Sequence, residues 1–187
     1  MYHIKDSEFL RGKVPMTKEE VRAVSIAKLD MKDTDICLDI GAGTGSVSIE
    51  MARFASKGKV YAIEEKQEAV DLIKENMKKF RVSNIELITG KAPEDLNKVK
   101  ADKIFIGGSG GNLDGIIRYS YEYLNIDGKI VLNFIVLENI FTALESLKKT
   151  GFQNIEITQM MISRNKTIKD FNMMVAENPI YIISAER

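Results

Sequence analysis

The sequence predicts a doubly wound α/β fold, in which a mostly parallel β-sheet carries helices on both faces. Three observations support this prediction. Short apolar runs alternate with amphipathic stretches from about residue 36 to about residue 150. The runs are continuously apolar, as in strands that are covered on both faces. A chain of 187 residues is long enough for one such domain and too short for two ordinary ones, so we expect a single domain over residues 1–187.

Apolar runs rich in isoleucine and valine indicate five parallel strands. Four of the runs are strong, and the run at residues 85–88 is weaker. Each run is only a few residues long, which is typical of a buried strand rather than of a buried helix. The five runs are Ile36–Leu38, Val60–Ile63, Ile85–Ile88, Ile104–Ile106 and Ile130–Leu132.

Crossover helices are expected between and after these strands, because apolar residues recur there at helical spacing. The stretch after the last run places Leu137, Ile140, Phe141 and Leu144 on one face, which we expect to cover the sheet. The other three apolar faces consist of Val47, Met51, Phe54 and Ala55; of Ala69, Leu72, Ile73, Met77 and Phe80; and of Leu113, Ile116, Ile117, Tyr121 and Leu124. Parallel strands joined by such helices form a doubly wound sheet.

The segment before the first strand differs from this pattern. Residues 5–16 show no periodicity and are expected to be irregular. Thr17 and Glu20 have the spacing of a capping box, in which the threonine caps a helix and the glutamate reaches back to it. We therefore expect a helix from Thr17 to about Asp30.

The last part of the chain predicts two further strands. Ile155 and Ile157 alternate with polar residues, and a second apolar run covers Ile180–Ile183. The segment around Arg164 between them has no helical pattern and is expected to be irregular. Two strands without a helix between them pair as an antiparallel hairpin, here with a long connection. The predicted sheet therefore has seven strands, mostly parallel, with this hairpin at its C-terminal end.

The composition excludes several classes of protein. Lys and Arg balance Asp and Glu at 27 each, so the chain lacks the positive charge of a general nucleic-acid or membrane binder. The first residues lack the apolar core of a signal peptide and no apolar stretch is long enough to span a membrane, which predicts a cytoplasmic location. With one cysteine, Cys37, and one histidine, His3, the chain cannot form a disulfide framework, a Cys/His zinc site or a Ser-His-Asp triad deep in the fold. No metal site is expected.

The strongest local motif is Leu38-Asp39-Ile40-Gly41-Ala42-Gly43-Thr44-Gly45, which follows the first strand and opens the first crossover helix. Glycines 41, 43 and 45 permit a tight turn and let a ligand approach bare backbone, beside the N–H donors of a helix N-terminus. The spacing G-x-G-x-G differs from the dinucleotide motif G-x-G-x-x-G, so NAD fits less well. We expect a small nucleotide-like cofactor at this edge of the sheet.

Two acidic residues complete the expected cofactor site. Glu64 ends the second strand, 19 positions after Gly45, where a carboxylate can accept hydrogen bonds from both ribose hydroxyls. Asp39 precedes the glycines, where it can accept hydrogen bonds from the loop amides and also lie near a cationic, methionine-type cofactor. We assign Asp39 both roles.

These motifs carry a family resemblance. Asp39 to Gly45, Glu64 and the segment Gly90-Lys91-Ala92-Pro93-Glu94 resemble the cofactor motifs of class I S-adenosylmethionine-dependent methyltransferases, whose order of strands and helices also matches. The run Gly107-Gly108-Ser109-Gly110-Gly111-Asn112, together with Phe9–Arg11, Val14–Thr17 and Met173–Val175, is similar to the decarboxylating cobalt-precorrin-6B C(15)-methyltransferases of cobalamin biosynthesis. The similarity extends from about Asp6 to about Ile183.

The resemblance implies a reaction, a cofactor, a substrate and an assembly. The implied reaction is methylation of precorrin C-15 by S-adenosylmethionine, coupled to decarboxylation of the C-12 acetate, which converts cobalt-precorrin-6B to cobalt-precorrin-7. This tetrapyrrole is the implied partner, and a homotetramer is the implied assembly. Family members often carry Asp where this chain has Glu64. The family's cofactor residues fall on Thr17, Gly41, Ala42, Gly43, Thr44, Gly45, Glu64 and Ala92.

The acceptor site is expected beside the glycine run after the fourth strand, at the topological switch point of the sheet. Backbone amides there can cradle a carboxylate, and they belong to Gly107, Gly108, Ser109, Gly110 and Gly111. The implied substrate carries many carboxylates, for which the candidate cations are Arg11, Lys13, Arg118, Arg164 and Lys166. We favour Arg11 and Arg164, since both lie in segments expected to be irregular and to border the site. No catalytic residue is assigned, because methyl transfer from a sulfonium requires alignment rather than a protein nucleophile.

Other functions stay open at this point. An RNA methyltransferase of the same fold would need a basic face and stacking aromatic residues, whereas the net charge is zero, tryptophan is absent and aromatic residues make up 7% of the chain. A non-catalytic scaffold with this fold is the second alternative, and the intact cofactor positions oppose it. A nicotinamide oxidoreductase is a more distant third.

Overall fold

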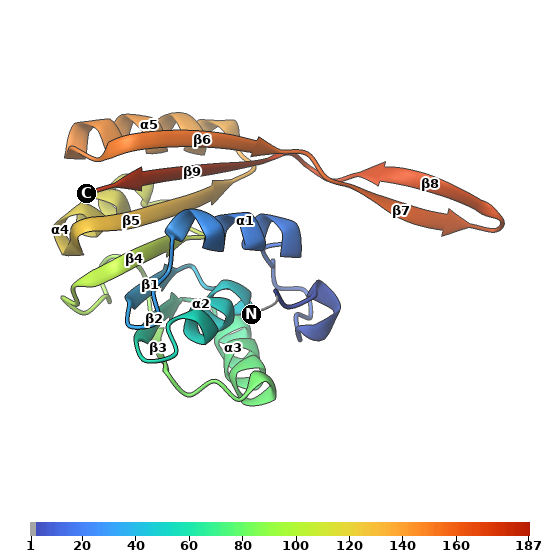
Figure 1. Cartoon of the computed structure of the whole chain (residues 1–187), viewed down its shortest axis with the longest axis horizontal. Coiled ribbons are helices and arrows are strands. Elements are labelled where there is room, and N and C mark those ends of the chain that lie inside the picture. The colour runs from blue at the N-terminus through green and yellow to red at the C-terminus, as the bar shows by residue number, and fades with distance from the viewer. Residues whose placement is uncertain (1–2) are drawn as a thin grey trace.

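The computed structural model describes residues 3–187, which form one large β-sheet with helices on both faces and a separate two-stranded arm (Figure 1). In chain order the elements are the 3-10 helix η1 (Asp6–Glu8), α1 (Glu19–Leu29), β1 (Ile36–Ile40), α2 (Ser46–Phe54), β2 (Lys59–Glu64), α3 (Gln67–Phe80), β3 (Ile85–Thr89), β4 (Ala101–Ile106), α4 (Leu113–Tyr123), β5 (Leu124–Phe134), α5 (Leu137–Thr150), β6 (Gln153–Met160), β7 (Ser163–Ile168), β8 (Phe171–Ala176) and β9 (Ile180–Glu186). Within the described residues, no helix combines the length and the apolar character that a membrane span requires.

The main sheet has seven strands in the order β3-β2-β1-β4-β5-β9-β6. The first five strands of this order run parallel to one another. β9 lies between β5 and β6 and is antiparallel to both. The predicted fold class is therefore confirmed, including the antiparallel pair near the C-terminus.

Successive residues of the parallel strands enter different cores, which explains why these strands are continuously apolar. In β1, Leu38 packs with α4 and α5, whereas Cys37 packs with α1, α2 and α3 on the opposite face. The same alternation recurs in β4, where Phe105 faces away from Ile104 and Ile106. A strand that is covered on both faces has no solvent side for polar residues.

The first long helix begins later than predicted. α1 begins at Glu19 after the N-cap residue Lys18, and no side chain caps it, so the predicted capping box is wrong. Tertiary contacts hold this segment instead. Glu20 lies 2.5 Å from the guanidinium of Arg164, and the Thr17 carbonyl accepts a hydrogen bond of 2.5 Å from Arg22.

A buried charge network fastens the segment before α1 to the rest of the fold. The Arg22 side chain is fully buried, and its Nε donates to Glu50 Oε1 at 2.6 Å. Its terminal nitrogens donate to the Ile4 carbonyl and, at 3.1 Å, to Asp6 Oδ1. His3 Nδ1 lies 2.5 Å from the other oxygen of Glu50. Although it contains little regular structure, this segment is therefore tied to both α1 and α2.

Residues 163–176 form an arm that projects from the rest of the molecule (Figure 1). β7 and β8 pair antiparallel in a sheet of their own, so the prediction of an irregular segment around Arg164 is wrong. Every residue of β8 is exposed, so the arm has no buried face to impose an apolar alternation on its sequence. The exposed apolar side chains of the arm strands are Ile168, Phe171, Met173, Met174 and Val175.

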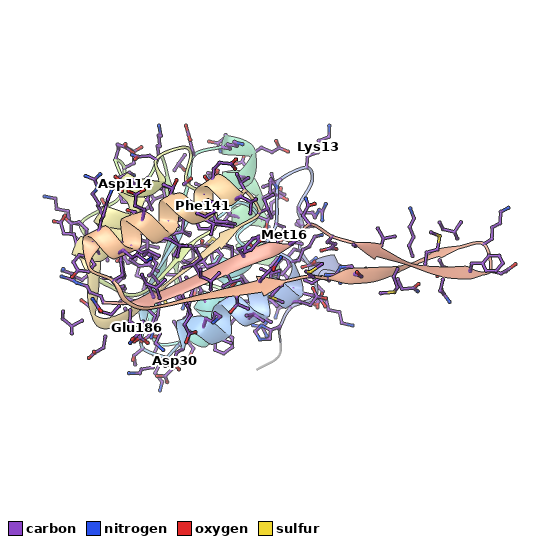
Figure 2. All side chains as sticks on the ribbon, turned by 90° about the horizontal axis from the view of Figure 1, so that it is seen from above. Lys13, Met16, Asp30, Asp114, Phe141 and Glu186 are labelled. Carbon is purple, nitrogen blue, oxygen red and sulfur yellow. The ribbon has the colours of Figure 1, made fainter. Side chains whose placement is uncertain are left out.

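α5 buries half of the face predicted: Ile140 is buried and Leu144 packs against the core, whereas Leu137 and Phe141 do not. Its buried line includes Ile140, Ala143 and Leu147, which belong to the same core as α4 and the sheet. Phe141 and Leu137, predicted to cover the sheet, are 70% and 54% exposed, and Figure 2 shows Phe141 on the outer side of the helix.

Candidate active site

The carboxyl ends of β1 and β4 meet where the strand order of the sheet reverses. β1 pairs with β2 on one side and with β4 on the other, and Ile40 is aligned with Ile106. The amides of Gly107 and Gly108 both donate to the Ile40 carbonyl, at 2.9 and 3.3 Å. The glycine run after β4 is thus joined to the glycine loop after β1, at the switch point where ligands bind in open α/β sheets.

The two glycine segments touch through bare backbone. A Cβ atom added to Gly41 would lie only 2.7 Å from the backbone of Gly108, and Gly41 also has a positive φ of 71°. A side chain is therefore excluded at Gly41 by both packing and backbone conformation. At Gly108 an added Cβ would meet its nearest neighbour, the Cα of Gly41, at an ordinary 3.8 Å.

A cavity of about 540 Å³ opens beside this contact, a volume within the range of small-ligand sites. Most of the residues predicted from the sequence come together in its lining. The predicted cofactor residues that line it are Thr17, Asp39, Gly41, Ala42, Gly43, Glu64 and Ala92. The predicted acceptor residues that line it are Gly107, Gly108, Ser109 and Gly110.

Five predicted residues lie outside the cavity lining: Thr44, Gly45, Gly111, Arg11 and Arg164. Gly45 is the N-cap of α2, and Thr44 before it is buried with its hydroxyl unpartnered. These two residues complete the turn that leads from the glycine loop into the helix. The binding roles assigned to all five stay predictions.

Arg164 is engaged in ion pairs at the base of the arm. Its Nε lies 2.8 Å from Glu177, and its terminal nitrogen lies 2.5 Å from Glu20 on α1. These carboxylates raise the pKa of Arg164 still further, and Arg164 in turn lowers the pKa of Glu20 against the opposing effect of burial. The reason for favouring Arg164, a position in an irregular segment, is wrong because the residue belongs to β7.

The other predicted cations are distributed unevenly. Lys13 lines the cavity, whereas Arg118 pairs with Asp114 on α4 and Lys166 lies exposed on the arm. Three lysines that were not predicted also line the cavity: Lys18, Lys66 and Lys91.

The Glu64 carboxylate organises the glycine loop. Its Oε2 accepts a hydrogen bond of 2.9 Å from the Gly43 amide, and its Oε1 accepts bonds of 3.1 and 3.0 Å from Glu65 and Lys66. The side chain therefore joins the end of β2 to the loop after β1. A carboxylate has about four lone-pair sites and three are used here, so Glu64 retains capacity for about one further donor, such as a ribose hydroxyl.

Asp39 is fully buried beside the cavity. Its Oδ2 accepts a hydrogen bond from the Ser48 hydroxyl, so Ser48 on α2 takes the place of the loop amides that the sequence predicted as donors. Its Oδ1 has no hydrogen-bond partner. Burial raises the pKa of Asp39 to about 7 against the hydrogen bonds from Ser48, and the nearby charge of Glu64 adds to the rise. An unpartnered buried acceptor is costly, so a ligand donor that reached this oxygen would complete the site.

Three parts of the cavity wall were largely missed by the patterns in the sequence. Residues 13–18 all line the cavity, and so do Asn133, Phe134 and Ile135 after the core of β5, and Glu177 and Ile180 near the base of the arm. The end of β5 lies at the same sheet edge as Glu64. Glu64 was selected because it ends a parallel strand, and the same reasoning would have selected the last residues of β5. Residues 13–18 have no periodic pattern; the family resemblance marked Val14–Thr17, and Lys13 was only one of five candidate cations.

Comparisons with known proteins agree over nearly the whole chain. The model of a family described as precorrin methyltransferase domain matches residues 8–187. A Saccharolobus solfataricus protein named probable cobalt-precorrin-6B C(15)-methyltransferase (decarboxylating) is 43% identical over 98% of this chain and 95% of its own length.

Two solved structures share the fold and the sequence. Precorrin-6y C5,15-methyltransferase from Geobacter metallireducens has a TM-score of 0.93 and 38% identity, covering 99% of this chain and 97% of its own. Precorrin 8W decarboxylase from Methanobacterium thermoautotrophicum has a TM-score of 0.91 and 34% identity, covering 98% of this chain and 100% of its own. On the strength of the family match, the relatives and the shared architecture, the chain belongs to the precorrin methyltransferase domain family.

Proposed function

We propose that this chain methylates C-15 of a precorrin ring with S-adenosylmethionine and decarboxylates the C-12 acetate, converting cobalt-precorrin-6B to cobalt-precorrin-7. The observation that carries the proposal is the cavity at the switch point, where both glycine segments and Glu64 meet in a member of the precorrin methyltransferase family. The names of the relatives, a decarboxylating C(15)-methyltransferase and a precorrin decarboxylase, favour this activity over an RNA methyltransferase or a scaffold.

Four features of the cavity support S-adenosylmethionine as the cofactor. The bare backbone of Gly41 and Gly43 leaves room for close approach, and the Glu64 carboxylate stands at the strand end suited to ribose hydroxyls. The unpartnered Asp39 Oδ1 is an acceptor for a cationic group. Ala92, in the loop after β3, adds a small apolar contact to the same wall.

When bound, S-adenosylmethionine supplies an activated methyl group on a sulfonium. The task of the protein is then alignment, since proximity accounts for most of the acceleration. We assign the cofactor side to the Gly41–Gly45 loop with Glu64, and the acceptor side to the Gly107–Gly111 run. The tetrapyrrole carbon C-15 provides the electron pair of the new carbon–carbon bond, so no protein nucleophile is required.

Decarboxylation requires that the acetate be aligned and poorly solvated. When its C–C bond breaks, carbon dioxide leaves, the electron pair passes into the conjugated ring, and one proton is taken up at the side-chain carbon. The backbone amides of Gly108 to Gly110 and the lining lysines Lys13, Lys18 and Lys91 are the groups placed to bind substrate carboxylates. Arg11 and Arg164 remain candidates for the outer carboxylates.

The decisive experiment is the mass of the product formed from cobalt-precorrin-6B and S-adenosylmethionine. Gain of one methyl group and loss of carbon dioxide are expected. Methylated product that retains the carboxylate would limit the enzyme to the first step, and unchanged substrate would overturn the proposal.

Calorimetry with S-adenosylhomocysteine tests the cofactor assignment separately. Glu64→Ala removes charge-assisted hydrogen bonds, so the affinity should fall about 10- to 100-fold. Glu64→Asp keeps the charge and should retain more of the affinity. Binding of NAD in place of S-adenosylhomocysteine, or equal affinity in Glu64→Ala, would contradict the assignment.

The exposed arm supports the homotetramer that the family resemblance implies. An isolated two-stranded hairpin is marginally stable in water, yet β7 and β8 expose Phe171 at 74% and Met174 at 67%. Burial of these side chains against other copies of the chain would stabilise both the arm and the assembly.

A further inference from the structure

One side chain behind the cavity joins two of its walls. Asn76 lies on α3, is fully buried and is absent from the cavity lining. Its Oδ1 accepts a hydrogen bond of 2.9 Å from the Leu10 amide, and its Nδ2 donates to the Leu10 carbonyl at 2.7 Å. The same Nδ2 also donates to the Thr44 carbonyl at 3.0 Å. All three bonds reach backbone atoms, so they hold the chain at positions 10 and 44 directly.

The segment that Asn76 holds forms one side of the cavity, and we call residues 10–18 the strap. The strap has no helix or strand, and its residues 13–18 all line the cavity. It lies against the glycine loop, because a Cβ atom added to Gly43 would be 3.0 Å from the Pro15 carbonyl. Arg22 holds its far end through the Thr17 carbonyl. The strap is thus fixed at two points, with the middle facing the cavity.

The chain before the strap has anchors that do not involve Asn76. The Phe9 ring contacts both the Arg22 guanidinium and the Phe80 ring, each 4.8 Å from its centroid. Lys79 donates to the Glu8 carbonyl at 2.5 Å. Loss of the Asn76 side chain would therefore leave the N-terminal segment attached and would release the Leu10 end of the strap from the glycine loop, while Arg22 still holds the Thr17 end.

We propose that Asn76 is a positioning residue that sets the separation between the strap and the glycine loop and so preorganises the cofactor pocket. The inference rests on the proposed function, because it takes the cavity as the S-adenosylmethionine site. Apparent affinity falls in proportion to the fraction of molecules in the binding-competent state. If the strap occupies its closed position in about one molecule in ten once Asn76 is gone, the affinity falls about tenfold.

The test compares two asparagines that make similar bonds in different places. Asn84 donates to the carbonyls of Ala52 and Ala55, at 3.0 and 2.8 Å, and is absent from the cavity lining. Asn76→Ala and Asn84→Ala should both lower the melting temperature. Only Asn76→Ala should weaken the binding of S-adenosylhomocysteine in calorimetry, by about tenfold. Asn76→Ser, a smaller disturbance of the same site, takes its place if the alanine variant does not fold.

Trypsin provides a readout of the strap that needs no ligand. The strap contains three cleavage positions, after Arg11, Lys13 and Lys18. Well below the melting temperature, cleavage at Arg11 and Lys13 should be about tenfold faster in the Asn76 variant than in the wild type. The Asn84 variant should be cleaved like the wild type. S-Adenosylhomocysteine should slow the cleavage of the wild type.

The outcomes distinguish a failure of the positioning role of Asn76 from a failure of the proposed function. Wild-type binding of S-adenosylhomocysteine, with a loss of affinity and faster strap cleavage confined to the Asn76 variant, supports the inference. If the Asn76 and Asn84 variants bind equally well and are cleaved equally slowly, Asn76 has only a structural role and the inference is overturned. A wild-type protein that does not bind S-adenosylhomocysteine overturns the proposed function, and the inference with it.

Discussion

Asp39 is a site residue whose acidity the fold alters strongly. It is fully buried, one of its oxygens has no partner, and burial raises its pKa to about 7. At neutral pH the group is therefore balanced between its neutral and charged forms. A cationic ligand next to it favours the charged form and lowers its pKa, so binding and proton release are coupled.

Binding of S-adenosylmethionine should accordingly tighten as the pH rises from about 6 to about 8. Asp39 is then already deprotonated in a growing fraction of the free protein, so fewer molecules must release a proton in order to bind. Calorimetry across this range, in buffers of different ionisation enthalpy, measures both the affinity and the proton release. Asp39→Asn should bind more weakly and lose most of this pH dependence. An equal pH dependence in the variant would assign the proton to another group.

Gly41 and Gly108 should respond differently to the same added methyl group. Gly108→Ala has room for its Cβ, so the variant should fold and bind S-adenosylhomocysteine within a few fold of the wild type. Its turnover should be lost, because the methyl group enters the space that we assign to the acceptor. Gly41→Ala creates a 2.7 Å backbone contact and should instead lower the melting temperature. Wild-type turnover in Gly108→Ala would show that the run is only a turn.

At the scale of the elements, the sequence predicts structure in two situations. One is where residues are buried, and the other is where residues follow the carboxyl end of a parallel strand, at which ligands bind. The parallel strands are apolar on both faces, and Glu64 and both glycine segments follow strand ends, so both the sheet and the core of the site were predictable. The arm was missed because its residues are exposed and carry no burial pattern. The capping box was wrong because Glu20 pairs with Arg164, 144 positions away. The role of Asn76 could not be predicted either, because it depends on contacts with positions 10 and 44, which are distant in the sequence.

The arm should hold copies of the chain together without stabilising the folded state of each copy. Phe171→Asp places a charge on the apolar surface of β8 and should convert tetramers to smaller species in sedimentation velocity, with little change in the circular dichroism spectrum. Ile126→Asp is a matched control, because Ile126 is also 74% exposed but lies outside the arm in β5. A wild-type protein that sediments as a monomer would contradict the proposed assembly.

At the scale of the whole molecule, one buried ion pair joins the N-terminal segment, α1 and α2. Arg22 and Glu50 are 0% and 2% exposed. The Arg22 guanidinium also donates hydrogen bonds to the carbonyls of Ile4 and Thr17, at the two ends of the N-terminal segment. Removal of one partner leaves the other charge buried without its counter-ion, which is far more costly than loss of an exposed pair.

Glu50→Gln keeps the shape of the side chain and removes its charge, so it should lower the free energy of unfolding by about 3 kcal/mol. Urea unfolding measures this change. Glu145→Gln interrupts the exposed pair between Glu145 and Lys149 and should hardly alter the midpoint. Similar midpoints for the two variants would mean that the buried network contributes little to stability.

The position of β9 has a consequence for the order in which the sheet is assembled. β9 follows β6 in the chain yet lies between β5 and β6, so β6 cannot join the sheet until β9 is in place. During folding, the outer edge of β5 therefore stays unpaired until this late closure, and an open edge invites pairing with another unfinished chain. β7 and β8 are close in the sequence and can pair early. Their pairing shortens the flexible part of the connection between β6 and β9, and so lowers the entropic cost of bringing β9 to the sheet. Early pairing within the arm would thus speed the folding of the chain, before any other copy of it is met.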